Sequence, residues 1–226
     1  MARLLAERDS TPLHLTLARR HERLARRYRQ DSLADAIKAS AKALKDKADL
    51  SEERDLDRQS AYDNVLAADA DLDDAVRNLF NATEIHDRQH PTTPARAILF
   101  PDGGFTSITD EPIVREPAIV LALATKLDSL GAPHALAPHA ALLRTAAQGV
   151  TDALAAQESA IRASKSADAE EEIAAAALRR QYEGNYLDAR KTPPPRRAPL
   201  PQRPQQHPRY PRAKPRAHPG LALKGS

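Results

Sequence analysis

The sequence predicts an all-α protein: an elongated antiparallel bundle of about four long helices, with one inserted β-hairpin and a C-terminal tail. Two observations favour this fold. Apolar residues make up 41% of the 226 residues but aromatic residues only 4%, and a core built on Ala and Leu suits closely packed helices. Residues 13–90 contain neither Gly nor Pro, so a long helical half can form there without interruption.

The charge is divided by position along the chain. Residues 191–226 contain nine Lys or Arg and no acidic residue, whereas residues 1–190 contain 25 basic residues and all 31 acidic ones. Ten of the 18 prolines also lie in the last 36 residues, a composition typical of extended, disordered chains. We therefore expect a mildly acidic helical domain at 1–190 and a disordered basic, Pro/Arg-rich tail at 191–226.

The first predicted helix begins at Ser10 or Thr11, either of which can cap it, with Pro12 in the first turn. Apolar residues follow at helical spacing, and their phase changes near residues 30–32. The change predicts either a bend or a short turn between two helices, and we favour the bend. The two stripes are Leu13, Leu17, Leu24 and Tyr28, and then Ile37, Ala41, Leu44 and Ala48.

A second helix is predicted to start at Ser51, with two Glu residues in its first turn, where negative charge suits the helix dipole. The chain would then reverse near Leu50, so that residue 50−k lies beside residue 50+k. This register brings the stretch 26–29 beside the acidic residues 71–74 and favours charge pairing within the chain. Binding of the Arg-rich stretch 19–29 to a polyanion is the alternative.

Residues 97–109 (AILFPDGGFTSIT) predict the β-hairpin, with its turn at 101–104. Two strands alone are marginal in water, so the hairpin must pack on something. It would either cover the open end of the bundle or offer an exposed edge to a partner. In the second case the candidate partner-binding residues are Phe100, Phe105 and Ile108.

The motif LFPDGGFTSITDEPI, set between Ala-rich long helices, resembles a loose group of helical proteins from high-GC bacteria. Those sequences share an F-P-x-G turn followed by an I/V-T-x-x-P helix start. The resemblance covers residues 99–113 and the general helix pattern. It implies the helix–hairpin–helix layout and implies no activity. The matching positions are Phe100, Pro101, Gly103, Ile108, Thr109 and Pro112.

Two more helices are predicted after the hairpin. The TDEPI motif opens a shorter one that would stop at Gly131. The last helix runs from about Pro138 to Asp188, with Gly149 and Gly184 as weak points because Gly is a poor helix former.

The stretch HDRQH contains the candidate metal ligands His86 and His90, four residues apart on one helical face. It is similar to the H-E-x-x-H zinc helix, with the shorter Asp87 in place of Glu and a proline that ends the helix at once. His134 and His139 could complete a four-ligand site. A metal-dependent enzyme at this site is the alternative function. The other interpretation is that the two His residues interact with the C-terminal helix dipole.

Other classes of chemistry are not indicated. The chain has no Cys, which excludes disulfides and thiolate sites, and it has no phosphate-binding loop or nucleophile elbow. We therefore expect no cofactor. The start lacks the apolar segment of a secretory signal, and the longest apolar run, residues 118–124, is too short to span a bilayer. We expect no transmembrane segment and a cytoplasmic location.

The tail suits a polyanion such as nucleic acid, with salt-sensitive and sequence-independent binding. A simple spacer is the alternative. The sequence therefore predicts a non-enzymatic structural or interaction protein, a helical scaffold that self-associates or binds another protein and contacts a polyanion through its tail. The candidate polyanion-binding residues are Arg196, Arg197, Arg203, Arg209, Arg212, Lys214 and Arg216.

Overall fold

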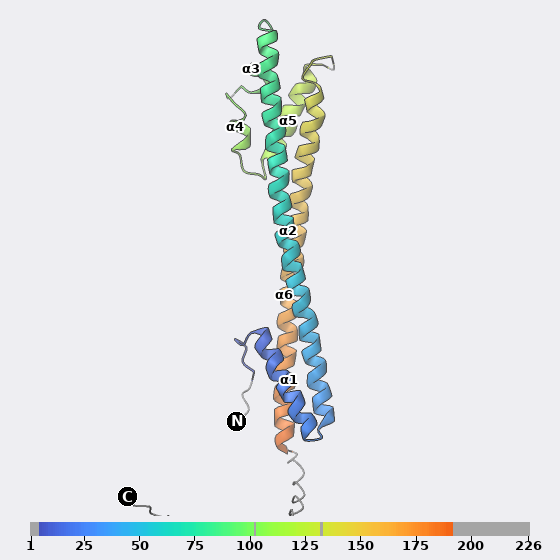
Figure 1. Ribbon diagram of the computed structural model, residues 1–226. Helices are drawn as coiled ribbons and strands as arrows, with labels where there is room; N and C mark the ends of the chain where they lie inside the picture. The colour runs from blue at the N-terminus through green and yellow to red at the C-terminus, as the bar shows by residue number, and fades with distance from the viewer. Residues whose placement is uncertain (1–4, 102, 132, 192–226) are drawn as a thin grey trace, which may run out of the picture. The chain divides into compact units, whose positions relative to one another are not determined.

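The computed structural model describes residues 5–101, 103–131 and 133–191, and this part of the chain is all-helical, without a strand (Figure 1). The chain divides into two units, Met1–Thr192 and Pro193–Ser226. Of the predicted tail at 191–226, Lys191 is the last residue of the final helix, and the rest lies outside the described residues. The helices of the first unit are α1 (Thr11–Arg27), α2 (Asp31–Gln89), α3 (Arg96–Leu99), α4 (Thr106–Thr109), α5 (Glu116–Ser129) and α6 (Pro138–Lys191).

The two longest helices, α2 with 59 residues and α6 with 54, run antiparallel side by side (Figure 1). Each is about 80–90 Å long at 1.5 Å per residue. Ser51 Oγ donates to Asp168 Oδ1 at 2.7 Å, and Ser164 Oγ donates to Asp55 Oδ1 at 2.9 Å. In both pairs the residue numbers add to 219. Residue i of α2 therefore faces the neighbourhood of residue 219−i in α6.

Residues at every seventh position face the opposite long helix. In α2 one such series begins at Ile37 and ends at His86, and only Arg58 within it is exposed. A seven-residue repeat keeps one stripe of each helix turned toward its partner. The buried members of this series are Ile37, Leu44, Ser51, Val65, Leu72, Leu79 and His86, and those of the matching series in α6 are Leu143, Val150, Ser164, Leu178 and Asn185.

Two separate cores form where a third helix joins the long pair. At one end α5 packs on α6 and shares a hydrophobic core with α2, with α3 and α4 beside it; at the other end α1 packs on both long helices (Figure 1). The α5 core includes Leu72, Val76, Leu79, Leu99, Phe100, Ile108, Val120, Leu123, Leu127, Leu143 and Val150. The α1 core comprises Ala18, Ile37, Leu44, Ala175, Leu178 and Tyr182.

Between the two cores lies a stretch that we call the bare section, residues 52–64 of α2 and 151–163 of α6. None of these described residues is buried. Both Ser–Asp hydrogen bonds between α2 and α6 lie at its α1-core end. The seam within it therefore has no buried core, and apolar side chains such as Leu154 and Ile161 are only partly buried there.

The predicted reversal at Leu50 and helix start at Ser51 are wrong. α2 passes through both positions without a break, because no Gly or Pro interrupts residues 13–90. The Ser51 hydroxyl bonds Asp168 of α6 and caps no helix. The predicted pairing of residues 26–29 with residues 71–74 is therefore wrong too, since these stretches belong to opposite ends of the long helices.

The phase change near residue 30 is a turn, not the bend that the sequence favoured. Arg29 has a φ of 60°, and Gln30 N–H donates to the Ala25 carbonyl oxygen at 2.9 Å. This turn folds α1 back onto α2. Of the predicted stripe, Leu24 is 43% exposed and Tyr28 49%, whereas the buried face consists of His14, Ala18 and Ala25. The small alanines allow α1 to approach the long helices closely.

The predicted β-hairpin at 97–109 is also wrong, because these residues contain the short helices α3 and α4. Asp87 of α2 caps α3: its Oδ1 accepts from the Ala95 N–H at 2.7 Å and its Oδ2 from the Arg96 N–H at 3.0 Å. A cap from eight residues upstream gives no local sequence signal. The alternative that this segment covers the bundle agrees with its packing on the α5 core.

The two later helices agree with the prediction in type. α6 begins at Pro138 as predicted and continues through Gly149 and Gly184. α5 begins at Glu116, later than the TDEPI motif indicates, because the preceding residues form a turn in which Arg115 N–H donates to the Pro112 carbonyl oxygen at 2.7 Å.

Leu44→Ala is expected to lower the free energy of unfolding by about 2–4 kcal/mol, because Leu44 is fully buried in the α1 core. The matched control is Leu56→Ala in the same helix, where the side chain is 61% exposed and the expected loss is within about 0.5 kcal/mol. Urea unfolding followed by circular dichroism measures both. Equal losses for the two variants would contradict the assigned burial of α2.

Candidate functional site

Three of the four histidines considered as metal ligands meet where α2 ends. His86 lies in the last turn of α2, His90 follows directly after that helix, and His134 lies in the connection between α5 and α6. The ring centroids of His86 and His90 are 4.7 Å apart, and those of His86 and His134 are 4.6 Å apart, with tilts of 40° and 37°. The sequence-based grouping of these three residues is therefore correct in space.

The rings stack on one another and do not converge on a common point. His86 is 8% exposed, and its Nδ1 lies 3.2 Å from Asp87 Oδ1. His134 Nδ1 accepts the Leu136 N–H at 3.2 Å. Burial lowers the pKa of His134, and charge on His86 and His90 lowers it further. The arrangement therefore favours the neutral form of the His134 imidazole.

Asp87 occupies the position that the general base holds in a zinc helix, but in this fold it caps α3. Both of its carboxylate oxygens accept backbone N–H groups at the start of α3. Burial opposes ionisation of this carboxyl, but these N–H groups and His86 outweigh it and lower the pKa of Asp87. The carboxylate is therefore held as an anion by α3 and is not free to activate a water molecule.

His139 does not join the other three histidines. It lies in the first turn of α6 and lines a groove of about 730 Å³ with Ala75, Asn78 and Leu142. Within residues 5–101, 103–131 and 133–191, no group of three or more His, Asp or Glu side chains is arranged to hold a metal ion. The predicted four-ligand arrangement is therefore wrong for this conformation.

A cluster of carboxyl groups that sequence reasoning missed lies between α2 and α5. Glu116, the first residue of α5, is 1% exposed and lies within hydrogen-bonding reach of Asp73 and Asp69 of α2. Glu116 Oε1 and Asp73 Oδ1 are buried and have no hydrogen-bond partner. Two carboxylates cannot bond each other without a proton, so the cluster is satisfied when Glu116 is protonated.

The cluster shifts the ionisation of its members. Burial, followed by the charges of Asp73 and Asp69, raises the pKa of Glu116 to about 8. Burial, with a smaller contribution from Asp73, also raises the pKa of Asp69. Near neutral pH Glu116 is thus a neutral acid that can donate a hydrogen bond from α5 to α2. The spacing of Asp69 and Asp73 on one helical face was visible in the sequence, but Glu116 as their neighbour was not.

The predicted partner-binding residues belong to the protein's own core. Phe100 is 4% exposed and Ile108 is 7% exposed. Phe80 of α2 packs edge-on against both Phe100 and Phe105, with centroid distances of 5.2 and 5.6 Å. The prediction that Phe100 and Ile108 bind a partner is therefore wrong, because these side chains pack in the α5 core.

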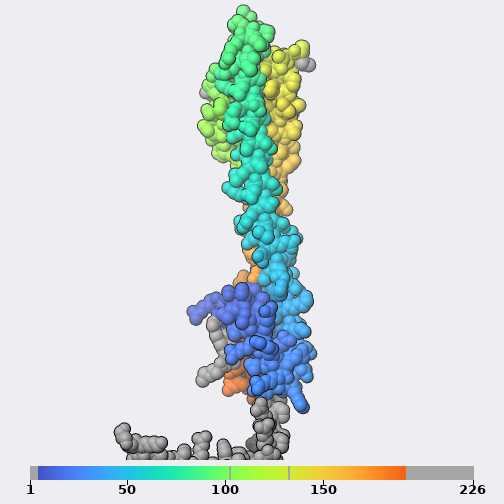
Figure 2. Space-filling model, in the orientation of Figure 1, coloured from blue at the N-terminus to red at the C-terminus, as the bar shows by residue number. Residues whose placement is uncertain are grey.

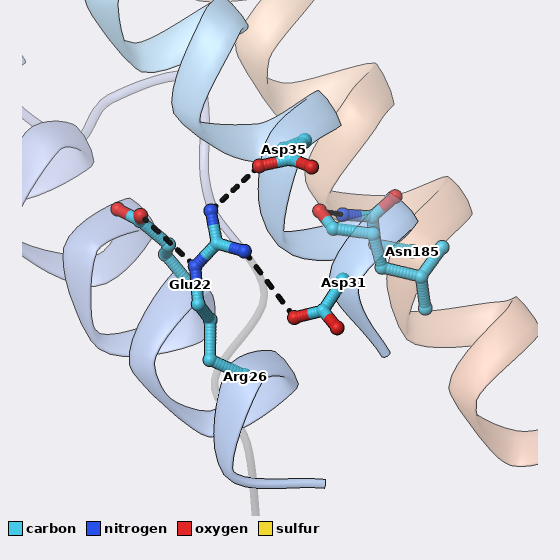
Figure 3. Close-up of polar contacts among 6 residues, drawn as sticks. Glu22, Arg26, Asp31, Asp35 and Asn185 are labelled. Atoms are coloured by element: carbon cyan, nitrogen blue, oxygen red, sulfur yellow. Dashed lines mark hydrogen bonds and ion pairs between the residues drawn. The ribbon is translucent and has the colours of Figure 1, made fainter. Parts of the chain in front are cut away.

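The Arg-rich stretch of α1 lies beside the start of α2. Arg26 contacts Glu22 in its own helix and bonds Asp31 and Asp35 of α2 at 3.2 and 2.6 Å (Figure 3). The hydrogen bond to Asp35 raises the pKa of Arg26 above its ordinary value. Charge pairing within the chain thus occurs at this arginine, but with acidic residues other than those predicted. The seven tail residues predicted to bind a polyanion lie outside the described residues.

Comparisons of the chain with protein-family models, with curated proteins and with solved structures found no match. The search for membrane spans found no sufficiently long and apolar helix among the described residues.

Glu116→Gln is expected to remove much of the pH dependence of stability between pH 4.5 and 8. The unfolded chain releases the Glu116 proton near pH 4.5, whereas the folded chain keeps it to about pH 8, so the free energy of unfolding falls as the pH rises through this window. At pH 8.5 the variant should exceed the native chain in stability by about 1–2 kcal/mol, and at pH 4.5 by less than about 0.5 kcal/mol.

Urea unfolding at several pH values measures the effect. Glu158→Gln, a change of the same kind at an exposed position of α6, is the control and should leave the native pH dependence unchanged. A Glu116→Gln variant that keeps the native pH dependence would show that the retained proton is not on Glu116.

Proposed function

We propose that this protein is a non-enzymatic scaffold: an antiparallel coiled coil of α2 and α6 that keeps two cores apart, self-associates through its bare section and contacts a polyanion with its tail. The observation that carries the proposal is that α2 and α6 lie side by side from the α1 core to the α5 core, while third helices pack on them only at these two cores. A long helix pair without a covering layer is an arrangement suited to contacts with other chains.

Apolar side chains on and next to the bare section support self-association. Leu56 is 61% exposed, Tyr62 52% and Leu66 48%. Tyr62 and Ile161 line a shared groove of about 280 Å³ that runs between the two long helices. Two copies packed over these side chains would form a four-helix layer and bury surface that one copy leaves in water.

The charge of the bare section sets the conditions for this contact. Residues 52–64 contain five acidic and two basic residues, and residues 151–163 contain two acidic and one basic. The bare section therefore carries a net charge of about −4 in each copy. Two copies repel each other at low salt, and screening should strengthen their association. Polyanion binding has the opposite salt dependence.

Replacing Tyr62 and Leu66 together by Glu is expected to shift the protein toward the monomer, because two negative charges would enter a contact that is already negatively charged in both copies. Sedimentation equilibrium at 0.05 and 0.5 M salt measures the change. The control is Ile85→Glu with Ile173→Glu, at positions 54% and 66% exposed outside the bare section. A native chain that stays monomeric at both salt concentrations would contradict self-association.

Neutralising the tail is expected to weaken nucleic-acid binding by the full chain. With the seven basic residues between positions 196 and 216 changed to Gln, the slope of log K against log salt should become shallower by about 3–6, since each lost phosphate contact removes about 0.9. Fluorescence anisotropy with a 30-base-pair DNA duplex measures this slope. A native chain that does not bind the duplex in 50 mM salt would contradict the polyanion part of the proposal.

A further inference from the structure

Charge is distributed unevenly along the helical unit. Residues 39–177 contain 13 basic and 24 acidic residues, a net charge of −11. Residues 1–38 and 178–190 together contain 12 basic and seven acidic residues, a net charge of +5, and the tail from residue 191 adds nine positive charges. Within the helical unit, the two ends of the sequence thus carry net positive charge and the part between them carries net negative charge.

Contacts within the α1 core bring these two terminal segments together. Asn185 Nδ2 near the end of α6 donates to the Leu33 carbonyl oxygen at 2.9 Å (Figure 3). The rings of His21 and Tyr182 lie 4.8 Å apart. Arg20 lies close enough to Tyr182 to oppose, through its charge, the rise that burial causes in the pKa of Tyr182. One end of the helix pair is therefore basic, and the tail begins where α6 ends at this same end.

Four exposed arginines occupy one face of α1: Arg19, Arg20, Arg23 and Arg27. At about 100° per residue they span an arc of about 100°, roughly opposite the buried face that contains Ala18 and Ala25. α1 itself lies on the surface of the molecule (Figure 2). The arginines therefore point away from the helices on which α1 packs.

These four arginines differ from Arg26 in having no partner. Arg26 is engaged by three carboxylates (Figure 3). Arg19, Arg20, Arg23 and Arg27 form no ion pair or hydrogen bond with any other residue that the structure describes. Their guanidinium groups are therefore available to an external anion.

We propose that this arginine face of α1 binds the phosphate backbone of double-stranded nucleic acid. The inference rests on the polyanion binding proposed above and adds a site within the helical unit. Guanidinium groups bind phosphates with two parallel hydrogen bonds. From Arg19 to Arg27 the face extends about 12 Å, which matches three to four phosphates of one strand at about 3.4 Å each.

The packing of α1 favours nucleic acid over an anionic membrane. A helix that lies on a bilayer inserts its apolar face among the lipids. The face of α1 that contains Ala18 and Ala25 is already buried, with these side chains 1% and 5% exposed, and is not free to insert. The free side of the helix offers chiefly charge and hydrogen-bond donors, which suit a phosphate polymer.

The test compares two fourfold variants of the full chain by anisotropy with the 30-base-pair duplex across a salt series. The first is R19Q/R20Q/R23Q/R27Q. The control, R88Q/R115Q/K126Q/K165Q, removes the same charge from exposed positions of α2, α5, α6 and the turn before α5, all outside the bare section. The α1 variant should bind at least tenfold more weakly than the control in 50 mM salt, and its slope should be shallower by about 2–4.

The outcomes separate this inference from the function on which it rests. If the α1 variant and the control bind alike while the tail variant is weakened, the arginine face is overturned and the proposed tail contact stands. If the native chain binds no duplex, the polyanion function itself fails and the face fails with it. Native binding to vesicles containing anionic phosphatidylserine but not to the duplex would overturn the choice of nucleic acid.

The comparison requires that the α1 variant keeps the far-UV circular dichroism of the native chain. If the fourfold variant loses it, the two pairs R19Q/R23Q and R20Q/R27Q take its place. Each pair removes two of the four guanidinium groups, so each should make the slope shallower by about 1–2. Folded pairs that bind like the native chain would overturn the arginine face.

Discussion

Neither α2 nor α6 could hide its apolar positions alone, and a single helix of this length in water would have no tertiary support. The two helices therefore depend on each other, and their register determines the position of every other element. The Ser51–Asp168 and Ser164–Asp55 hydrogen bonds fix that register at a residue sum of 219. Once it is fixed, α1 must pack beside the last turns of α6, and the His86 end of α2 must meet the connection that contains His134.

The same register places the weakest part of the molecule between its two cores. Aliphatic side chains fill the seam at both ends, but the bare section contributes no buried residue to it. Hydrogen bonds between Ser and Asp specify alignment and add little net stability, typically about 1 kcal/mol each. The α1 core and the α5 core are thus two separate sources of cooperative stability, connected by a stretch of the two helices that has no buried residue. Such a section can accept a second chain without displacing any part of its own core.

Predictions from the sequence were reliable where they depend on local signals, namely helical periodicity and the positions of Gly and Pro. They included the all-α class, the start of α6 at Pro138 and the meeting of His86, His90 and His134. The predictions were wrong where residues that match a local pattern make tertiary contacts instead. Ser51 followed by two Glu residues matches a helix start, yet its hydroxyl is bonded across the seam to Asp168. The segment with Phe100 alternates like a hairpin, but Asp87 caps it as a helix from a distance. Glu116 gave no signal, since its neighbours Asp69 and Asp73 are more than 40 residues away in the chain.

The continuity of α2 through Leu50 also determines the electrostatics of the molecule. A reversal at Leu50 would have neutralised the arginines of α1 against residues 71–74 and left a short, charge-balanced bundle. Because α2 continues to Gln89, those acidic residues lie toward the α5 core, and among the described residues of α1 Arg26 is the arginine that forms ion pairs. The uncompensated charge of Arg19, Arg20, Arg23 and Arg27 is therefore a direct consequence of helix continuity. A helix pair with net negative charge over most of its length and free guanidinium groups at one end is electrostatically polar, and a polyanion would be repelled by the long section and attracted at the α1 end. The fold itself would then determine how the protein is oriented on a polyanion.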